Sequence, residues 1–241
     1  MKKFLVIGNP IDHSLSPKLH NYWIKNNNIK AIYEKQKLEN SQIKDLILKV
    51  KKKEISGINI TVPFKKTVIP YLDELSVEAK RTESVNTIYL HKEKTVGHNT
   101  DIEGFERSIN DIINFDIKDK KILILGAGGV VPSLIFALEK MKVSRITLSN
   151  RTKEKAEDLK KLFKDLSIIN WGQIEDSDMI INATSLGLSE EDKIDLDFSQ
   201  IKKGKLFYDI IYNPRETNFL KTGKSLGITT LNGKLMFIYQ A

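Results

Sequence analysis

The sequence predicts an α/β protein of two domains, the second of them a doubly wound domain of the Rossmann type. Short apolar runs alternate with amphipathic helical segments along the chain, as in proteins built on mostly parallel sheets. A glycine-rich turn near residue 126 stands between an apolar run and an apolar helix, as a dinucleotide-binding fold requires. The 241 residues are enough for two domains with cores of their own.

The expected strands are short apolar runs bounded by turn-forming or charged residues. Their ranges are 4–7, 31–34, 57–61, 87–90, 121–125, 145–149, 179–182, 206–210 and 229–231. The residues that lead up to His98 predict a hairpin. No internal repeat and no low-complexity linker interrupts the series.

Helical segments fill most of the intervals between these strands. Ser16-Pro17 predicts a helix start, with Ser16 as the cap and Pro17 in the first turn, where its missing N–H group costs nothing. Residues 42–53 predict an amphipathic helix, and residues 102–114 predict another that connects the two domains. Their buried faces are formed by Ile43, Leu46, Ile47 and Val50 in the first and by Phe105, Ile109, Ile112 and Ile113 in the second.

The composition is that of an ordinary soluble protein, with 40% hydrophobic and 29% charged residues. No apolar run approaches the length of a membrane span or of a signal-peptide core, so we expect a cytoplasmic protein with no membrane partner. The absence of cysteine excludes disulfides, thiolate metal sites and cysteine nucleophiles. The four histidines form no short ligand pair, so we expect no metal.

The net charge of +8 raises the question of nucleic-acid binding. The densest group of lysines, in residues 49–53, ends the helix predicted at 42–53, where cations suit the helix dipole. No aromatic-rich basic strand or finger motif accompanies them. We therefore expect a general attraction for anionic metabolites and no nucleic-acid partner.

The most informative segment places two short polar side chains and one ammonium group at the end of an apolar run. It reads Asn59-Ile-Thr-Val-Pro-Phe-Lys65. Pro63 cannot donate to a ladder and pushes Val62 into an extended conformation, so the strand ends before it and Lys65 follows a rigid turn. By itself, a lysine in this place is either a solvated surface charge or a group that meets a substrate.

A glycine turn opens the second half of the chain, where the strand at 121–125 runs into Gly126-Ala-Gly-Gly129 and an apolar helix. Glycines let the backbone approach a pyrophosphate, and the helix N-terminus offers it free N–H groups and a partial positive charge. The pattern is shorter than the full Gly-x-Gly-x-x-Gly, with Val131 in the third small position. Pro132 stands early enough in the helix to be tolerated.

The end of the next strand favours NADP over NAD. Where an NAD-binding protein places an acidic residue on the ribose, this chain reads Ser149-Asn-Arg-Thr152. A carboxylate would repel a 2′-phosphate, whereas Arg151 can hold it with a charge-assisted fork and Asn150 and Thr152 can donate further bonds. Lys155, one helical turn on, either adds to this charge or is an ordinary surface lysine.

Further polar residues lie near other element ends, where α/β proteins build their sites. They are Ser14, Ser16, Asn86 and Asp101. Each has a structural explanation, as a helix cap, a turn residue or an acid at a helix N-terminus. Together with Lys65 they offer hydroxyls, amides, an ammonium and a carboxylate, which suit a small polyhydroxylated acid better than an apolar ligand.

Ten short motifs extend over essentially the whole chain. They are Gly8-Asn-Pro10, Ser14-Leu-Ser-Pro17, Asn59-Ile-Thr-Val-Pro-Phe-Lys65, Ser84-Val-Asn-Thr87, Gly97-His-Asn-Thr-Asp101-x-x-Gly104, Gly126-Ala-Gly-Gly129, Asn150-Arg-Thr152, Asn182-Ala-Thr-Ser-x-Gly187, Asp209-Ile-Ile-Tyr212-x-Pro214 and Gly233-x-x-Met236 with Tyr239-Gln-Ala241. With them the chain resembles the shikimate dehydrogenases of the bacterial biosynthetic type. The resemblance implies reversible reduction of 3-dehydroshikimate to shikimate by NADPH, on the chorismate route to the aromatic amino acids. The chain departs from the family at Val131-Pro132, and it ends at Ala241, beyond which the family continues.

The resemblance makes Lys65 and Asp101 the catalytic pair. Lys65 would stabilise and protonate the oxygen that gains charge, while Asp101 holds Lys65 and a substrate hydroxyl. Either residue can be assigned the formal proton transfer, and we expect Lys65 to carry it. Ser14 and Ser16 would contact the substrate at its carboxylate, and the other implied substrate ligands are Asn59, Thr61, Asn86, Tyr212 and Gln240.

The resemblance also implies a cofactor, NADP(H), on the second domain. Gly126, Ala127, Gly128, Gly129 and Val130 would hold the pyrophosphate, Asn150, Arg151, Thr152 and Lys155 would lie at the 2′-phosphate, and Ile210 and Gly233 would lie near the nicotinamide. Thr184 either reaches the cofactor or has only a turn role. Residues 1–101, joined by 234–241 of the last helix, would form the substrate domain and residues 102–233 the NADP domain, with a cleft between them.

Two alternatives stay open at this stage. A relative that also accepts quinate, often with NAD, would share nearly every motif, although Arg151 and the paired serines argue against it. A metabolite sensor that keeps the fold without catalysis is the second alternative, and the presence of both Lys65 and Asp101 argues against it. The sequence is compatible with a monomer or a homodimer.

Overall fold

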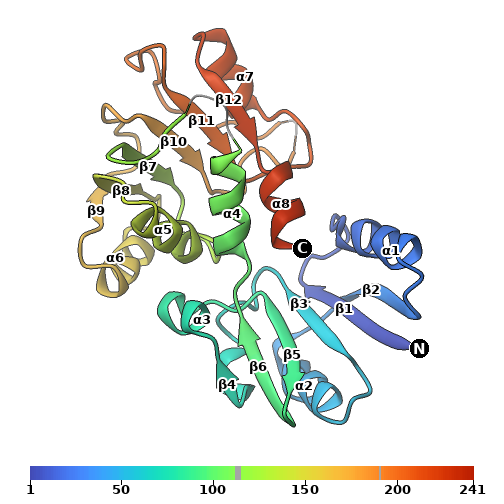
Figure 1. Cartoon of the computed structure of the whole chain (residues 1–241). Coiled ribbons are helices and arrows are strands. Elements are labelled where there is room, and N and C mark those ends of the chain that lie inside the picture. Colours follow the sequence, from blue (N-terminus) through green and yellow to red (C-terminus); the bar gives the residue numbers. More distant parts are fainter. Residues whose placement is uncertain (112–114, 190) are drawn as a thin grey trace. The chain divides into compact units, whose positions relative to one another are not determined.

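The computed structural model describes residues 1–111, 115–189 and 191–241, which form two compact units (Figure 1). The first unit consists of Met1–Asp101 and Ala241, and the second of Ile102–Gln240. Residues 234–240 thus belong to the second unit, while their expected role beside the first unit stays a prediction. The assignment of substrate and NADP to separate domains, with a cleft between them, also stays a prediction.

The first unit is built on a six-stranded mixed sheet. Its strands are β1 (Lys2–Gly8), β2 (Ala31–Lys37), β3 (Gly57–Ile60), β4 (Glu74–Leu75), β5 (Thr87–His91) and β6 (Lys94–His98), in the order β2-β1-β3-β5-β6-β4. β1 pairs in parallel with both β2 and β3, whereas β5 and β6 form an antiparallel hairpin beside β3. The hairpin predicted before His98 is therefore present, and it is what makes this sheet mixed.

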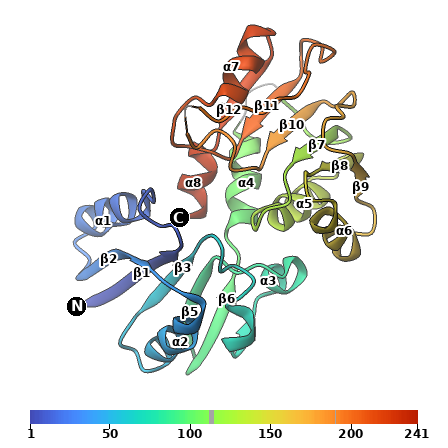
Figure 2. The same cartoon turned by 180° about the vertical axis from the view of Figure 1, so that it is seen from behind.

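Helices α1 (Ser16–Asn26) and α2 (Ile43–Lys51) cover opposite faces of this sheet (Figures 1 and 2). The predicted apolar face of α2 is buried against Leu5 and Ile7. The other face of β1 presents Val6, which packs with Tyr33 of β2 and with Ile24 of α1. Period-two alternation along β1 thus divides its side chains between two layers. A shorter helix, α3 (Val77–Thr82), and the turns Asn40–Gln42 and Ile69–Tyr71 complete the unit.

The second unit has a six-stranded sheet in which every pairing is parallel. Its strands are β7 (Lys121–Leu125), β8 (Arg145–Ser149), β9 (Ser167–Ile169), β10 (Met179–Asn182), β11 (Leu206–Asp209) and β12 (Thr229–Asn232), in the order β12-β11-β10-β7-β8-β9. The sequence runs outward from β7 to β9 and then from β10 to β12 on the other side. This is the doubly wound arrangement that the sequence predicted.

Helices cover both faces of this parallel sheet. They are α4 (Asp101–Asn110), α5 (Val131–Lys140), α6 (Lys153–Leu162), α7 (Asn218–Ser225) and α8 (Lys234–Gln240). Ile122 and Ile124 of β7 pack with α4 and α5, whereas Leu123 and Leu125 pack with Phe219 of α7. The near-continuous apolar strands that revealed the sheet in the sequence are thus explained by burial on both sides.

The structure also differs from the sequence predictions in local detail. Ser16 is the first helical residue rather than the cap of α1, since the cap position is Leu15 and the Ser14 hydroxyl accepts the Ser16 N–H at 3.3 Å. The two short strands β4 and β9 were not predicted, because two or three residues carry too little periodicity. Ile112 and Ile113 of the predicted connecting helix lie outside the described residues.

Among the residues that the structure describes, no helix is long and apolar enough to cross a membrane. In the same part of the chain, no three histidine, aspartate or glutamate side chains are grouped so that they could hold a metal ion.

Helix α1 carries one titratable ring that is partly buried against the sheet. His20 stacks on Tyr33 with ring centroids 4.1 Å apart and planes 5° from parallel. Burial lowers the pKa of His20 from its ordinary value of 6.5 to about 4. The folded chain therefore keeps this ring neutral over a pH range in which the unfolded chain protonates it.

We expect the free energy of unfolding to decrease as the pH falls from 6.5 to about 4, because only the unfolded chain binds a proton at His20 over this range. The contribution is about 1 to 2 kcal/mol, since the ring keeps part of its hydration. Urea unfolding between pH 7.5 and pH 4.5 measures the slope. His20→Phe retains an aromatic ring that cannot titrate and should flatten the curve, so an unchanged slope in this variant would contradict the assignment.

Candidate active site

The predicted catalytic residues meet in an ion pair that is largely buried within the first unit. Lys65 Nζ lies 2.5 Å from Asp101 Oδ2, and the two side chains are only 11% and 8% exposed. A lysine that merely served as a solvated surface charge would be far more exposed, as its neighbour Lys66 is at 78%. The structure therefore removes the surface interpretation of Lys65 that the sequence left open.

The turn after β3 fixes the backbone of Lys65. The Phe64 N–H donates to the Thr61 carbonyl at 3.0 Å, and the Val85 N–H donates to the Lys65 carbonyl at 2.9 Å. Phe64 and Val68, on either side of Lys65, are 2% and 0% exposed and anchor the turn in the core. The lysine side chain thus starts from a backbone position with little freedom.

Asn86 fixes the other partner of the pair. Its side-chain N–H groups donate to Asp101 Oδ1 at 3.0 Å and to Thr100 Oγ1 at 2.9 Å, and its Oδ1 accepts the Thr100 N–H at 2.9 Å. The Asp101 N–H in turn donates to Asn99 Oδ1 at 3.1 Å. Asp101 begins α4, where the helix dipole favours a carboxylate. Both oxygens of this buried carboxylate are therefore paired.

Asn59 and Thr61 stand beside this pair, on or just after β3. Asn59 Nδ2 donates to the Asn86 carbonyl and to Thr87 Oγ1, so it joins the same polar network. The Thr61 methyl group lies close to Gly8, where an added Cβ would come within 2.6 Å of it. Asn59 and Thr61 are both partly exposed, so a ligand can reach their side chains.

The remaining predicted substrate residues are divided between the units. Ser14 and Ser16 flank the start of α1 in the first unit, and both are partly exposed. Tyr212 belongs to the second unit, where it stacks on Phe237 with ring centroids 4.3 Å apart. Gln240 also belongs there, and α8 approaches α4 so closely that a Cβ on Gly104 would lie 2.8 Å from the Gln240 Cβ.

The glycine turn of the second unit has the conformation that the dinucleotide prediction needs. Gly126 has a φ of +106°, and a Cβ there would lie 2.8 Å from the Ala183 carbonyl oxygen. Gly128 and Gly129 are exposed, and α5 begins two residues later at Val131. The predicted pyrophosphate residues, from Gly126 to Val130, thus form one turn at a helix N-terminus.

The predicted 2′-phosphate residues follow β8. Arg151, Thr152 and Lys155 are exposed, and Asn150 Nδ2 donates to the Thr152 carbonyl at 2.6 Å. Asn150 therefore shapes the turn, which leaves Arg151 as the cationic group nearest the strand end. Because β7 and β8 are adjacent and parallel, the glycine turn and this cationic turn both lie at the carboxyl ends of the strands, on the same side of the sheet. The exposed backbone at Gly128 and Gly129 and the absence of an acidic side chain in residues 149–152 fit NADP.

A buried polar cluster that sequence reasoning did not assign also lies at the carboxyl ends of the strands, where β10 and β11 end. Asp209, with no exposed surface, accepts the Asn182 amide at 3.1 Å, the Ile211 N–H at 2.9 Å and the Thr217 hydroxyl at 2.5 Å. Burial raises the pKa of the Asp209 carboxyl above its ordinary value. The signal in the sequence was a polar residue at the end of each of two apolar strands.

This cluster positions two predicted cofactor residues. Asn182 Oδ1 accepts both the N–H and the hydroxyl of Thr184, at 3.0 and 2.7 Å, and the Asn182 carbonyl accepts the Ile210 N–H at 3.0 Å. Gly233 donates its N–H to the Ile211 carbonyl at 3.1 Å. Thr184 has the turn role that the sequence offered as one alternative, while its contact with a cofactor stays a prediction.

Two family models match the chain. The model of the shikimate dehydrogenase substrate binding domain matches residues 6–88, and the model named shikimate / quinate 5-dehydrogenase matches residues 108–219. A curated protein of Pelagibacter ubique (strain HTCC1062), named shikimate dehydrogenase (NADP(+)), is 60% identical over 240 residues, which cover 100% of this chain and 90% of that relative.

Solved structures agree with these matches. Shikimate dehydrogenase from Aquifex aeolicus superimposes with a TM-score of 0.92 at 38% identity, over 100% of this chain and 89% of that one. Shikimate 5-dehydrogenase from Thermus thermophilus, solved with NADP(H) and shikimate, gives a TM-score of 0.90 at 28% identity, over 100% of this chain and 90% of that one.

Substitution of alanine for Gly126 should destabilise the second unit by about 2 kcal/mol or more, because the new Cβ combines a disfavoured φ with a backbone clash. Gly128→Ala is the matched control, since its Cβ would meet nothing nearer than the Ala183 carbonyl at 3.7 Å. Thermal unfolding followed by circular dichroism compares the two. Equal melting temperatures for the two variants would show that the turn does not need this conformation.

Proposed function

The chain belongs to the shikimate dehydrogenase family, and we propose that it catalyses the reversible NADPH-dependent reduction of 3-dehydroshikimate to shikimate, a step in the biosynthesis of chorismate and the aromatic amino acids. It is an NADP-dependent oxidoreductase that acts on a CH–OH group. The observation that carries the proposal is the enclosed ion pair of Lys65 and Asp101, beside partly exposed hydroxyl and amide groups.

Lys65 supplies the acid that carbonyl reduction needs. An ammonium group has three N–H donors. Among the residues that the structure describes, one of these N–H donors of Lys65 is bound, to Asp101 Oδ2, so two N–H donors remain for a substrate oxygen. When the carbonyl oxygen gains negative charge, Nζ stabilises it by a hydrogen bond and transfers a proton to it. In the reverse direction, the neutral amine accepts the proton of the shikimate hydroxyl.

Asp101 keeps this lysine aligned in both directions. Its Oδ2 contacts Nζ while Oδ1 is held by Asn86, so the carboxylate cannot rotate away from the lysine without losing the Asn86 bond. The negative charge of Asp101 also compensates the ammonium in a place with little water. We assign the proton transfer to Lys65 and the orientation of Lys65 and of a substrate hydroxyl to Asp101.

The other substrate ligands that we propose in the first unit match a polyhydroxylated acid. Ser14 and Ser16 bind the carboxylate with hydroxyl donors, and Asn59, Thr61 and Asn86 bind ring hydroxyls. The partial exposure of Ser14, Ser16, Asn59 and Thr61 supports their assignment. Asn86 is only 3% exposed and acts mainly on Asp101 and Thr100. Tyr212 and Gln240 are retained as predicted substrate ligands.

NADP(H) supplies or accepts the hydride when it is bound. We propose that the turn of residues 126–130 binds its pyrophosphate, with Gly126 shaping the turn because its own N–H donates to the Ser149 carbonyl at 2.8 Å. Arg151 binds the 2′-phosphate, helped by Asn150, Thr152 and Lys155. Thr184, Ile210 and Gly233 are proposed neighbours of the nicotinamide. The support is the exposure of Gly128 and Gly129 just before α5 and the exposed cationic turn after β8.

Removal of the Lys65 ammonium should reduce kcat for shikimate oxidation about a hundredfold or more, since it deletes the proposed acid and oxyanion donor. Lys65→Ala is compared with Lys66→Ala, the adjacent lysine that pairs with Glu83 at the surface and should retain wild-type activity. Absorbance of the reduced nicotinamide measures turnover, with shikimate or quinate offered together with NADP or NAD.

The four pairings separate the alternatives. Turnover confined to shikimate with NADP, and lost in Lys65→Ala, supports the biosynthetic enzyme, whereas turnover of quinate or use of NAD places the chain among the broader dehydrogenases. Absence of turnover in folded wild-type protein that still binds shikimate would contradict an enzymatic role and favour a sensor.

Arg151→Ala should raise KM for NADP about ten- to a hundredfold and leave KM for NAD nearly unchanged, because only NADP carries the 2′-phosphate dianion that Arg151 is proposed to bind. Arg145→Ala is a suitable control, since Arg145 begins the same strand and pairs with Glu175 at 3.6 Å. Equal changes in both KM values would show that Arg151 does not read the 2′-phosphate.

A further inference from the structure

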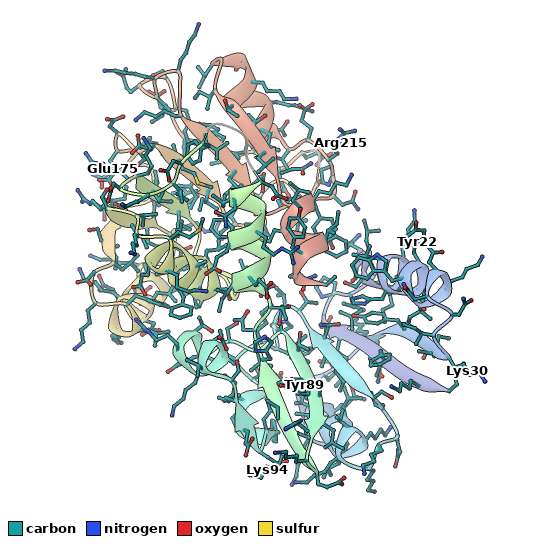
Figure 3. All side chains as sticks on the ribbon, in the orientation of Figure 1. Tyr22, Lys30, Tyr89, Lys94, Glu175 and Arg215 are labelled. Carbon is teal, nitrogen blue, oxygen red and sulfur yellow. The ribbon has the colours of Figure 1, made fainter. Side chains whose placement is uncertain are left out.

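The carboxylate of Asp209 is buried in the second unit without a cation beside it. Its side chain has no exposed surface, and in the part of the chain that the structure describes its hydrogen-bond partners are all neutral. Lys205, just before β11, pairs instead with Asp176 and Asp178, at 3.3 and 3.2 Å. Arg215, in the loop after β11, is exposed at the surface of the second unit (Figure 3).

The neutral partners of Asp209 all donate to it. Oδ1 accepts the Asn182 amide and the Ile211 N–H, and Oδ2 accepts the Thr217 hydroxyl. The orientation of the amide follows from its other bond, because Asn182 Oδ1 accepts the Thr184 N–H and leaves the NH2 group for Asp209. Donors of this kind favour the ionised form of a carboxyl group.

Burial acts against this ionised form. It raises the pKa of the Asp209 carboxyl above its ordinary value. An anion held away from water without an opposite charge costs free energy, and neutral donors offset only part of that cost. A cation that arrives with a ligand would compensate the charge.

Asp209 is the middle residue of three strand ends that are paired in register. Asn182 of β10 pairs with Asp209 of β11, and Asp209 pairs with Asn232 of β12. Two proposed neighbours of the nicotinamide, Ile210 and Gly233, come directly after Asp209 and Asn232. Gly233 lies so close to Ile210 that an added Cβ would overlap the Ile210 carbonyl group. The buried charge therefore lies within one residue of the backbone that is proposed to meet the nicotinamide.

The two forms of the cofactor differ in charge at this ring. The nicotinamide of NADP+ is a cation, and the dihydronicotinamide of NADPH, which carries the added hydride, is neutral. A fixed negative charge nearby attracts the first ring and has no net charge to attract in the second. Groups that only shape the loops act on both forms alike.

We propose that Asp209 sets the relative affinity of the site for NADP+ and NADPH, by placing a fixed negative charge at the nicotinamide end of the cofactor site. The proposal rests on the proposed function, since it takes Ile210 and Gly233 as neighbours of the nicotinamide. It goes beyond that function by giving an electrostatic role to a buried group that no motif assigned to substrate or cofactor.

Asp209→Asn removes the charge and keeps a hydrogen-bonding group of the same shape. Its Oδ1 can still accept the Asn182 amide and the Ile211 N–H, and its NH2 group can donate to Thr217 Oγ1. We expect Kd for NADP+ to rise about three- to tenfold, while Kd for NADPH stays within about twofold. Calorimetric titration with each form gives both values without turnover.

Two further variants separate the charge from its surroundings. Thr217→Val removes one hydrogen bond of Asp209 and keeps the charge, so any weakening should be equal for NADP+ and NADPH. Asp178→Asn removes a carboxylate from the opposite end of the sheet, before β10, and should leave both Kd values unchanged.

Asn232→Asp adds a charge to the same row and tests the opposite sign. Asn232 is partly exposed, and its Oδ1 accepts the Lys234 N–H at 3.2 Å at the start of α8, a role that aspartate retains. NADP+ should bind about two- to fivefold more tightly relative to NADPH in this variant. If Asp209→Asn does not fold, Asn232→Asp alone decides.

An unchanged ratio of the two Kd values in folded Asp209→Asn or in Asn232→Asp would overturn the proposal. Equal weakening of both forms in Asp209→Asn would also overturn it, since the carboxylate would then only shape the loops. Wild-type protein that binds neither NADP+ nor NADPH would instead refute the proposed function, and this proposal with it.

Discussion

The buried pair of Lys65 and Asp101 imposes a strict requirement on the first unit, because two charges taken out of water have to satisfy each other and every remaining polar atom around them. The turn after β3 delivers the lysine, and the first residue of α4 delivers the carboxylate, 36 positions later. Asn86, between them in sequence, holds the carboxylate oxygen that the lysine does not reach. The turn after β3, the residue before β5 and the first residue of α4 must therefore meet at one point. The hairpin of β5 and β6 brings the second and third of these together.

The second unit meets a comparable requirement at the carboxyl ends of its parallel strands. Asn182 and Asp209 are paired in register at the ends of β10 and β11, and together they bind the backbone that follows each strand. A buried carboxylate with three donors is rigid, and it determines the path of the loops that carry Thr184 and Ile210. Strand ends in parallel sheets are the usual place for ligand sites because side chains and free N–H groups from several loops converge there.

The strands and the chemical nature of the site were largely predictable from the sequence, but local geometry was not. Each of the nine predicted strands is present, since apolar runs between turn residues are a strong signal. Ser16 was wrongly predicted as a helix cap, because a Ser-Pro pair fits the cap and the first turn equally well. β4 and β9 are too short to show a period in the sequence. The mixed pairing of the first sheet could not be predicted either, because β5 of the hairpin pairs with β3, and the paired residues Asn59 and Thr87 are 28 positions apart in sequence.

The sequence by itself determined which chemical groups this protein has available and on which segments they lie: an ammonium after one strand, a carboxylate before a helix, glycines and an arginine after two others. Local patterns suffice for this because each depends on a few neighbouring residues. Only the tertiary structure decided which of these groups are buried and what they bind. Lys65 is enclosed rather than solvated, and Tyr33 reaches Asn59 across an intervening strand. Asp209 takes its partners from the end of β10 and from the loop that follows β11. Hydrogen bonds between residues far apart in the chain form only after the sheets have set their register, and no local pattern carries that information.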